Sequence, residues 1–397
     1  MVTPKIVPQN MSKLSGFFNP IDKSLALYAD MLPEGSIGKT LVMKFDEALF
    51  ENSKSSIVIF GVPEDRNAVN NKGTGKQLDT IRRELYQLYS GNWNTQIIDL
   101  GDIKIGDTIN DTEVAVKEVV SYLLKFKHLP IILGGSQALT YATYRAFDTL
   151  EQKVNLTVVD SKFDLGVIDN HIDSHSYLTK TVMEKPNNLF NFTNIGYQTF
   201  LNAQAEINLL DTLLFDAYRL GTIKNDFELV EPILRDTDIL SIDIGAVRKV
   251  DAPANNNAVI SGFDADAICK IARYAGLSDK LSVFGIYEYN ASQEQQMQTA
   301  QLIAQMIWYF VEGINYRSFE FPSTDLDNFK KYMVLVDDET FQFYKSDKTG
   351  RWWMEINVKE NNKTKRRTLI PCTYNDYLSA NRQEIPDRWY LNRRKLS

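Results

Sequence analysis

The stretch Val158-Val159-Asp160-Ser161-Lys162-Phe163-Asp164 decides the fold prediction, because an apolar, β-branched run ends there in closely spaced charged residues. This pattern indicates a buried strand that ends near Asp160. Two other segments lie at the ends of similar apolar runs: Gly134-Gly135-Ser136-Gln137 and Ser241-Ile242-Asp243-Ile244-Gly245. Ligands of open α/β sheets bind outside the carboxyl ends of the strands. The three segments are therefore predicted to meet at one site.

Short apolar runs alternate with longer helical patterns from Ile57 onward. This alternation predicts repeated βαβ units and a mostly parallel sheet. The predicted strands are Ile57–Val62, Gln96–Leu100, Pro130–Leu133, Leu156–Asp160, Thr193–Ile195, Ile239–Ile244 and Val283–Tyr287.

In their order and spacing the three segments resemble the ureohydrolase superfamily, which comprises arginases, agmatinases and formimidoylglutamases, and they are most similar to formimidoylglutamase. In that family a Gly-Gly-Asp-His, an Asp-Ala-His-x-Asp and a Ser-x-Asp-x-Asp stretch hold two manganese ions. The resemblance runs from about Ile57 to Gly313 and includes Glu288, whose surroundings are similar to the family's Val-Glu-Val-Asn-Pro stretch. It implies an arginase-like, three-layer α/β/α domain.

The six ligand positions that the resemblance implies fall on Gln137, Asp160, Lys162, Asp164, Asp243 and Gly245. Three carboxylates remain, and every imidazole is absent. Neither an amide nor a glycine can replace an imidazole or a carboxylate at a transition metal. In the family's reaction a water molecule attacks the substrate, and two divalent ions would be needed to lower the pKa of that water. We therefore expect a vestigial pocket, made of these six residues and Glu288, with no metal, no cofactor and no catalytic residue.

An alternative is a metal site with a non-standard set of ligands. Asp160, Asp164 and Asp243, with the side-chain carbonyl of Gln137, form an all-oxygen set of the kind that magnesium prefers. In that case manganese or magnesium would be the cofactor. Lys162 argues against it, because an ammonium repels an incoming cation. We predict instead that Lys162 replaces the lost metal, with its ammonium among the three carboxylates.

A second polar motif follows the Asp160 strand. His171-Ile172-Asp173-Ser174-His175 contains two of the three histidines in the chain, and His171, Asp173 and His175 would share one face of an extended strand. A zinc site would need a fourth ligand that the sequence does not identify. A polar surface loop is the favoured interpretation, and whether these three residues bind anything stays open.

Composition limits the classes of function. The chain has 397 residues, of which 44% are hydrophobic, enough for one large α/β domain and an appendage. It contains no run of about 18 apolar residues and no signal-peptide stretch in residues 1–19, so we expect a cytoplasmic protein without membrane insertion. The net charge of -7 argues against nucleic-acid binding. Its two cysteines make no disulfide framework.

Three parts are predicted: an N-terminal arm (1–50) with a helix at Ile21–Met31, a ureohydrolase-like α/β domain (51–316), and a β-rich C-terminal extension (317–397). In the extension the runs Tyr332–Val336, Phe341–Tyr344 and Trp352–Val358 alternate in the manner of strands, and Asp347–Gly350 is the predicted hairpin turn.

The extension carries two further features. Side chains alternate along a strand, so one of the adjacent Trp352 and Trp353 must face outward, toward the larger domain or a partner. The basic run Lys363–Arg367 is predicted to be a solvated loop.

Two functions are consistent with these residues. The main hypothesis is a catalytically inactive ureohydrolase-fold protein with a structural, regulatory or partner-binding role. Its extension would contact protein partners or further copies of the chain. The alternative is a hydrolase of formimidoylglutamate or a related amidine or guanidine that uses a non-standard metal site. The surviving Asp160, Asp164, Asp243 and Glu288 motivate the second.

Overall fold

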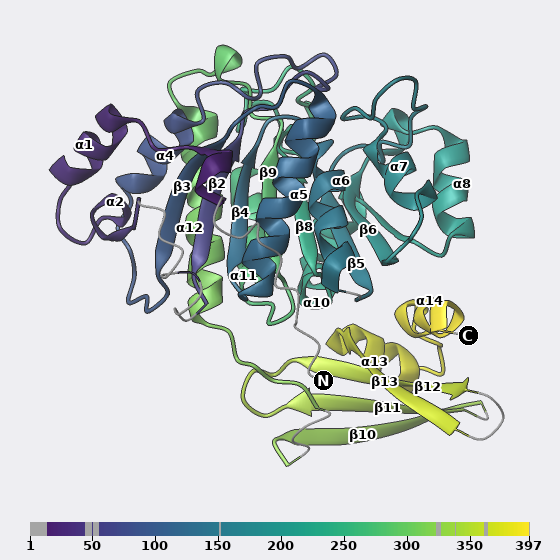
Figure 1. Cartoon of the computed structure of the whole chain (residues 1–397). Helices are drawn as coiled ribbons and strands as arrows, with labels where there is room; N and C mark the ends of the chain where they lie inside the picture. Colours follow the sequence, from purple (N-terminus) through teal and green to yellow (C-terminus); the bar gives the residue numbers. More distant parts are fainter. Residues whose placement is uncertain are drawn as a thin grey trace, which may run out of the picture.

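The larger domain is built on a nine-stranded sheet in the order β1-β3-β2-β4-β9-β8-β5-β6-β7 (Figure 1), seen in a computed structural model. All of its strand pairs are parallel except that of β1 with β3. The strands are β1 Phe18–Asn19, β2 Ile57–Val62, β3 Ile97–Ile103, β4 Leu129–Gly134, β5 Val154–Val159, β6 Leu189–Tyr197, β7 Asp216–Arg219, β8 Ile239–Asp243 and β9 Val283–Tyr287.

The structure describes residues 14–43, 50, 55–150, 152–322, 327–337, 339–360 and 364–396. The predicted N-terminal arm therefore lies in part outside the described residues. Its described part contains the expected helix, as α1 Lys23–Met31.

Helices cover both faces of the sheet, which confirms the predicted three-layer α/β/α fold. Because side chains alternate along a strand, Ile57 and Ile59 enter one hydrophobic core while Val58 and Phe60 enter the other. The first core lies against α4, α10, α11 and α12, and the second against α5, α6 and α7 (Figure 1). The helices of this domain are α1, α2 Ile37–Thr40, α4 Asp79–Tyr86, α5 Ile109–Lys125, α6 Leu139–Arg145, α7 Tyr177–Met183, α8 Gln204–Thr212, α9 Leu220–Asn225, α10 Val230–Arg235, α11 Ala265–Gly276 and α12 Gln298–Asn315.

All seven predicted strands are present, and Ile57–Val62 and Val283–Tyr287 have the predicted bounds. The prediction missed β1 and β7. Strand β7 consists of Asp-Ala-Tyr-Arg with no buried residue, so it lacks the apolar run that marked the others. It pairs only with β6, at the edge of the sheet.

The C-terminal extension forms a separate four-stranded antiparallel sheet in the order β10-β11-β12-β13. Its elements are β10 Phe329–Val336, β11 Glu339–Ser346, β12 Trp352–Glu360, β13 Thr364–Cys372, α13 Tyr374–Asn381 and α14 Asp387–Leu396. The turn predicted at Asp347–Gly350 joins β11 to β12. Both helices pack on one face of the sheet around Phe343, Trp352 and Trp389.

One prediction for the extension was wrong. The basic run Lys363–Arg367 is not a solvated loop, since Lys365, Arg366 and Arg367 pair with β12 as part of β13; Lys363 lies outside the described residues. The strand continues into Leu369 and Ile370, and β13 is an edge strand, a position where charged side chains are common. The prediction missed that the strand pattern runs through both the polar and the apolar half of β13.

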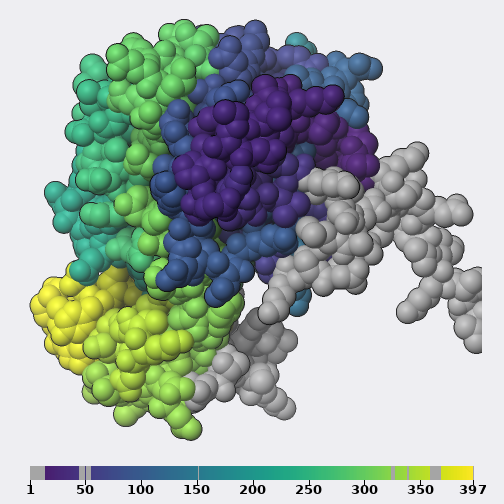
Figure 2. Space-filling view, turned by 90° about the vertical axis from the view of Figure 1, so that its left-hand side faces the viewer, coloured from purple at the N-terminus to yellow at the C-terminus, as the bar shows by residue number. Residues whose placement is uncertain are grey.

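The extension lies below the larger domain in Figure 1 and forms a distinct mass in Figure 2. It contacts the end of the domain at which β6, β7, β8 and β9 begin. Arg235, just before β8, donates from Nη2 to the carbonyl of Trp352 at 2.8 Å, and its guanidinium lies 4.2 Å from the centre of the Trp353 ring. Lys395 pairs with Asp216 at the start of β7 at 2.9 Å. The outward tryptophan is therefore Trp353, and it packs on the larger domain.

In the described part of the chain, no helix is long and apolar enough to cross a membrane.

Candidate functional site

Four neighbouring strands in the middle of the sheet, β4, β9, β8 and β5, bring the predicted pocket residues together at their carboxyl ends. The pocket lies at the opposite end of these strands from the extension. Its cavity has a volume of about 10 Å³, room for about one water molecule. The cavity is lined by Asp160, Ser161, Lys162, Asp164, Ser174, His175, Asp243, Gly245, Asn257 and Glu288.

Asp160 and Asp164 form a buried pair of carboxyl groups after β5. Oδ1 of Asp160 accepts from the backbone N–H of Lys162 at 2.9 Å, while Oδ2 is buried without a hydrogen-bond partner among the described residues. Burial raises the pKa of both carboxyl groups, and for Asp164 the negative charges of Asp160 and Asp243 raise it further. Two carboxylates so close together in a dry site favour holding a proton between them.

Asp243, at the end of β8, is held by hydrogen bonds on one oxygen. Its Oδ1 accepts from the backbone N–H of Gly245 at 2.6 Å and from the side-chain amide of Asn255 at 3.3 Å. Burial raises the pKa of Asp243, and the charges of Asp160 and Glu288 add to the rise.

Asn255 also occupies the space in front of Gly245. A Cβ placed on Gly245 would lie 3.0 Å from the Nδ2 atom of Asn255 and 3.0 Å from Oδ1 of Asp243. That is closer than a carbon normally approaches such atoms. A side chain at position 245 would therefore require the amide of Asn255 or the carboxyl group of Asp243 to shift by a few tenths of an ångström.

Glu288, which follows β9, is bound on both oxygens. Oε1 accepts from the backbone N–H of Gln137 at 2.9 Å, and Oε2 accepts from the side-chain amide of Asn71 at 2.8 Å. Burial nevertheless raises the pKa of Glu288 to about 7. The backbone of Glu288 has φ 68°, an uncommon value for a residue with a side chain and one that functional sites often hold.

Gln137 lies beside this group, and its Nε2 atom is buried without a hydrogen-bond partner among the described residues.

The predicted contact of the Lys162 ammonium with the carboxylates was wrong. Its Nζ lies 3.3 Å from Nε2 of His175, and within the part of the chain that the structure describes no ion pair joins it to Asp160, Asp164 or Asp243. Because Lys162 follows the strand on a half-exposed turn, its long stem reaches the opposite wall of the cavity. Its charge still lowers the pKa of Asp160 from a distance.

His175 lines the pocket, while His171 and Asp173, considered with it as a possible site, do not line this cavity. Oδ1 of Asp173 accepts from the backbone N–H of His175 at 2.9 Å and from the hydroxyl of Ser176 at 2.7 Å, which makes it a turn residue. His171 is exposed. Burial lowers the pKa of His175, and the nearby charge of Lys162 lowers it further. Among the described residues, no group of three or more His, Cys, Asp and Glu has the arrangement of a metal site.

Sequence reasoning missed Asn71 and Asn255, which supply the amide donors of the pocket. Asn71 lies 217 residues along the chain from Glu288, and Asn255 lies 12 residues after Asp243, in the loop region that follows β8. Their only signal was an unusual number of asparagines at Asn70-Asn71 and Asn255-Asn256-Asn257.

The family model described as the Arginase family matches residues 55–312. The chain belongs to the arginase family. The matched range agrees with the resemblance predicted from Ile57 to Gly313.

Individual relatives are distant. The chain is 24% identical to a formimidoylglutamase of Vibrio parahaemolyticus in an alignment of 309 residues that covers 69% of this chain and 89% of the relative. It is 25% identical to an agmatinase of Blochmanniella floridana over 274 residues, covering 62% of this chain and 88% of that enzyme.

Solved structures show the same fold for the larger domain. Formimidoylglutamase from Bacillus subtilis superposes with a TM-score of 0.63 and 17% identity, covering 70% of this chain and 92% of that one. Formiminoglutamase from Trypanosoma cruzi, solved with manganese, superposes with a TM-score of 0.62 and 20% identity, covering 68% and 98%. These superpositions leave about three-tenths of this chain uncovered.

Proposed function

We propose that this chain is a non-catalytic member of the arginase family, a cytoplasmic protein with a structural, regulatory or partner-binding role. The observation that carries the proposal is the amide of Asn255, which fills the space before Gly245 and binds Asp243. The amide of Asn255 and its hydrogen bond to Asp243 thus lie beside position 245, where the family resemblance implies a metal-binding aspartate. Asn71 and the backbone of Gln137 likewise hold Glu288.

The residues of the pocket do not fit a pair of manganese ions. Two ions need several carboxylate or imidazole donors each, but Lys162, Gln137 and Gly245 supply none at their positions. The cavity of about 10 Å³ holds one water molecule. The raised pKa values of Asp164 and Asp243 favour protons as the counter-charge of this cluster. We therefore derive no catalytic step through a metal.

A second candidate function is hydrolysis of formimidoylglutamate or a related amidine or guanidine at a single-metal site. It is favoured by the surviving carboxylates of Asp160, Asp164 and Asp243, and by relatives named as formimidoylglutamases and agmatinase. Among the described residues, Oδ2 of Asp160 is a buried carboxylate oxygen without a hydrogen-bond partner that could bind such an ion.

Elemental analysis separates the two functions. The full chain, produced in medium supplemented with manganese and magnesium, is expected to carry far less than one divalent ion per chain after gel filtration. Hydrolysis of formimidoylglutamate, agmatine and arginine is then measured with each ion added. Bound manganese near one or two ions per chain, together with turnover that a chelator abolishes, would contradict the proposal and support the hydrolase.

A further inference from the structure

The outer edge of the small sheet has the features of a self-pairing interface. Strand β10 pairs with β11 along its whole length, from Phe329 opposite Ser346 to Val336 opposite Glu339. Among the described residues no strand pairs with its other edge, since β10 ends the strand order. The other edge strand, β13, contacts the larger domain at its last residue, where Arg235 donates to the carbonyl of Cys372 at 3.4 Å. It differs from β10 in carrying the basic residues Lys365, Arg366 and Arg367.

The second half of this edge strand lacks the usual protection against pairing, while its first half carries Lys330 and Lys331. Edge strands normally carry inward-pointing charges, proline or a bulge, which keep other strands from adding to them. The centre of β10 is Tyr332-Met333-Val334-Leu335-Val336, with neither a charge nor a proline. Val334 and Val336 point into the core of the extension, whereas Met333 is 68% exposed and Leu335 is 61% exposed on the opposite face. Two large apolar side chains thus lie on the surface of an unpaired strand.

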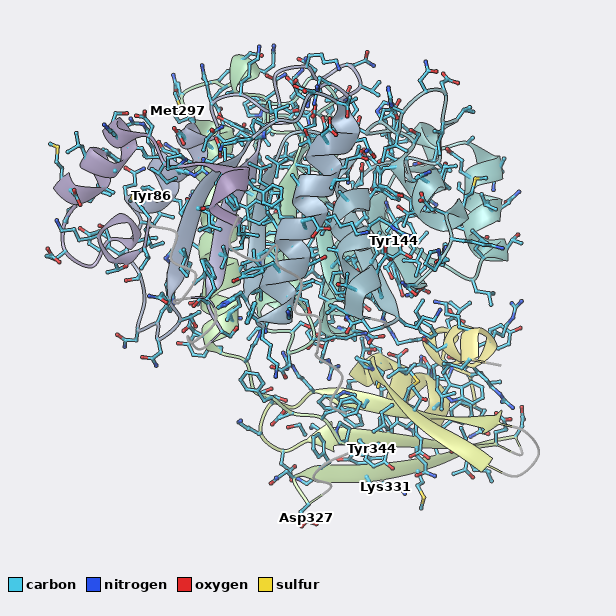
Figure 3. The ribbon with its side chains drawn as sticks, in the orientation of Figure 1. Tyr86, Tyr144, Met297, Asp327, Lys331 and Tyr344 are labelled. Carbon is cyan, nitrogen blue, oxygen red and sulfur yellow. The ribbon has the colours of Figure 1, made fainter. Side chains whose placement is uncertain are left out.

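The charges at the two ends of β10 are complementary to each other. Lys331 lies near its start, and Asp337 follows its end at the turn into β11. The Lys331 ammonium lies 5.8 Å from the centre of the Tyr344 ring, and no ion pair joins it to another described residue. Figure 3 labels Lys331 and Tyr344 on the small sheet, and Lys331 lies nearer the margin of the molecule that points away from the larger domain. A strand that is basic at one end and acidic at the other matches an antiparallel copy of itself.

We propose that two copies of this chain associate through antiparallel pairing of their β10 strands, with Val334 of each copy at the two-fold axis. In a two-fold interface each contact occurs twice. This register places Met333 opposite the partner's Leu335 and Lys331 opposite the partner's Asp337. Residues that lie directly opposite one another in an antiparallel pair point to the same face. Both apolar pairs therefore lie on the face where these side chains are now exposed. Asp337 follows the strand in a turn with φ 50°, and its exposed carboxylate lies at the strand end that the partner's Lys331 approaches.

A shift of one residue in the register is excluded by the pleat, because it would set buried positions of one copy beside exposed positions of the other. A shift of two residues would place Lys331 opposite Leu335 and lose both charge pairs. The inference does not depend on the chemistry of the pocket, because the pocket lies at the opposite end of the larger domain. A result against the pairing would therefore not bear on the proposed absence of catalysis, and a result against that absence would not bear on the pairing.

Register-specific cross-linking tests the pairing. Full-length Met333→Cys and Leu335→Cys proteins, mixed and mildly oxidised, are expected to form a disulfide-linked dimer, and each alone much less. The native Cys269 and Cys372 are free and buried, so they do not interfere. A mixture that yields no more cross-linked dimer than either protein alone would overturn the proposed register.

Charge exchange provides a second test, with sedimentation velocity as the readout. Lys331→Asp and Asp337→Lys each place like charges opposite one another, and each is expected to weaken association about tenfold or more. The double variant restores both pairs and should return association toward wild type. Ile260→Lys, a change at an exposed apolar residue of the larger domain, is the matched control.

Three outcomes overturn the proposal: a wild-type chain that sediments as a single copy at all concentrations, charge variants that associate like wild type, or a double variant that is no better than the single ones. If the chain also assembles through other surfaces, the single charge variants are expected to halve the mass of the assembly. If the cysteine variants form a disulfide only with an extended segment of another protein, the partner of β10 is that segment and not a second copy of the chain.

Discussion

At the scale of single residues, Asn255 distinguishes this pocket from a metal site. Its effect can be tested by putting the missing metal ligands back. We expect Gln137→His, Lys162→His and Gly245→Asp together to restore only weak manganese binding, because the amide of Asn255 crowds a side chain at 245 and binds Asp243. Adding Asn255→Ala removes that obstacle. Titration calorimetry should show binding at least about tenfold tighter for the quadruple variant, the size of effect that residues around metal ligands commonly have.

The triple variant is the control in that experiment. Equal affinity of the two variants would show that Asn255 moves aside freely. Failure of both to bind any divalent ion, while both remain folded, would contradict the placement of at least one strand end.

The raised pKa of Asp164 predicts a pH-dependent gain in stability on removing its charge. The native state holds the Asp164 proton to higher pH than the unfolded chain does, so wild-type stability falls as pH rises through the native pKa. Asp164→Asn cannot ionise. In chelator-treated protein we expect it to become more stable than wild type as pH rises through that pKa, by about 1.4 kcal/mol for each unit of difference.

The difference should shrink as pH falls below the native pKa of Asp164 and close when pH reaches the pKa of an unfolded aspartate. Asp169→Asn, an exposed change in the same loop, should alter the free energy of unfolding by less than about 0.5 kcal/mol throughout. Denaturant melts at several pH values provide the comparison. A gain that does not depend on pH would mean that the Asp164 carboxyl is not buried among charges.

Much of the candidate site could be predicted from the sequence, because strand ends fix where its backbone lies. Asp160, Asp164, Asp243, Gly245 and Glu288 line one cavity as expected. The direction of the Lys162 side chain could not be predicted, since a four-carbon stem reaches several acceptors from one backbone position. Asn71 comes from a distant loop and Asn255 from the loop region after β8, and no local pattern specifies their hydrogen bonds.

At the scale of elements, apolar runs predicted the strands that are buried on both faces, such as β2 and β9, with their bounds. Strands at sheet edges were missed or cut short, because their backbone pairing does not require apolar side chains. Strand β7 and the basic half of β13 are of this kind. Sequence periodicity therefore identifies the interior of a sheet better than its margin.

The contact of α10 with the extension depends on Arg235, which leads to a prediction for that element. Arg235→Ala removes hydrogen bonds to Trp352 and Cys372 and the contact with the Trp353 ring. We expect a loss of about 2–4 kcal/mol in the free energy of unfolding. Arg235→Met should cost less, because Nε and Nη1 have no partner among the described residues and burial lowers the pKa of Arg235 to about 10.

Arg382 serves as the control for Arg235, since its ion pair with Glu384 is exposed and Arg382→Ala should cost less than about 1 kcal/mol. Limited proteolysis of residues 316–328 measures how firmly the extension is held, and it should speed up for Arg235→Ala alone. Equal proteolysis of both variants would place the main contact elsewhere.

At the scale of the whole molecule, the larger domain and the extension have separate hydrophobic cores among the described residues. The two cores of the larger domain contain residues up to Ile314, and the core of the extension starts at Tyr332. The contacts between the units include many polar ones, such as Glu231 with Arg351 at 3.0 Å and Lys395 with Asp216 at 2.9 Å. Each unit therefore buries its own apolar surface.

This separation predicts that the larger domain folds without the extension. The cut belongs after Ser318 rather than after residue 316, because Arg317 donates to the carbonyls of Gly276 and Leu281 on the larger domain. We expect residues 1–318 to be soluble and to unfold in one cooperative transition, since removal of the extension chiefly returns polar groups such as Arg235, Glu231 and Asp216 to water. Calorimetry and gel filtration measure both properties. Aggregation of residues 1–318, when the full chain stays in solution, would show that Trp353 and its neighbours cover an apolar surface that the larger domain cannot expose.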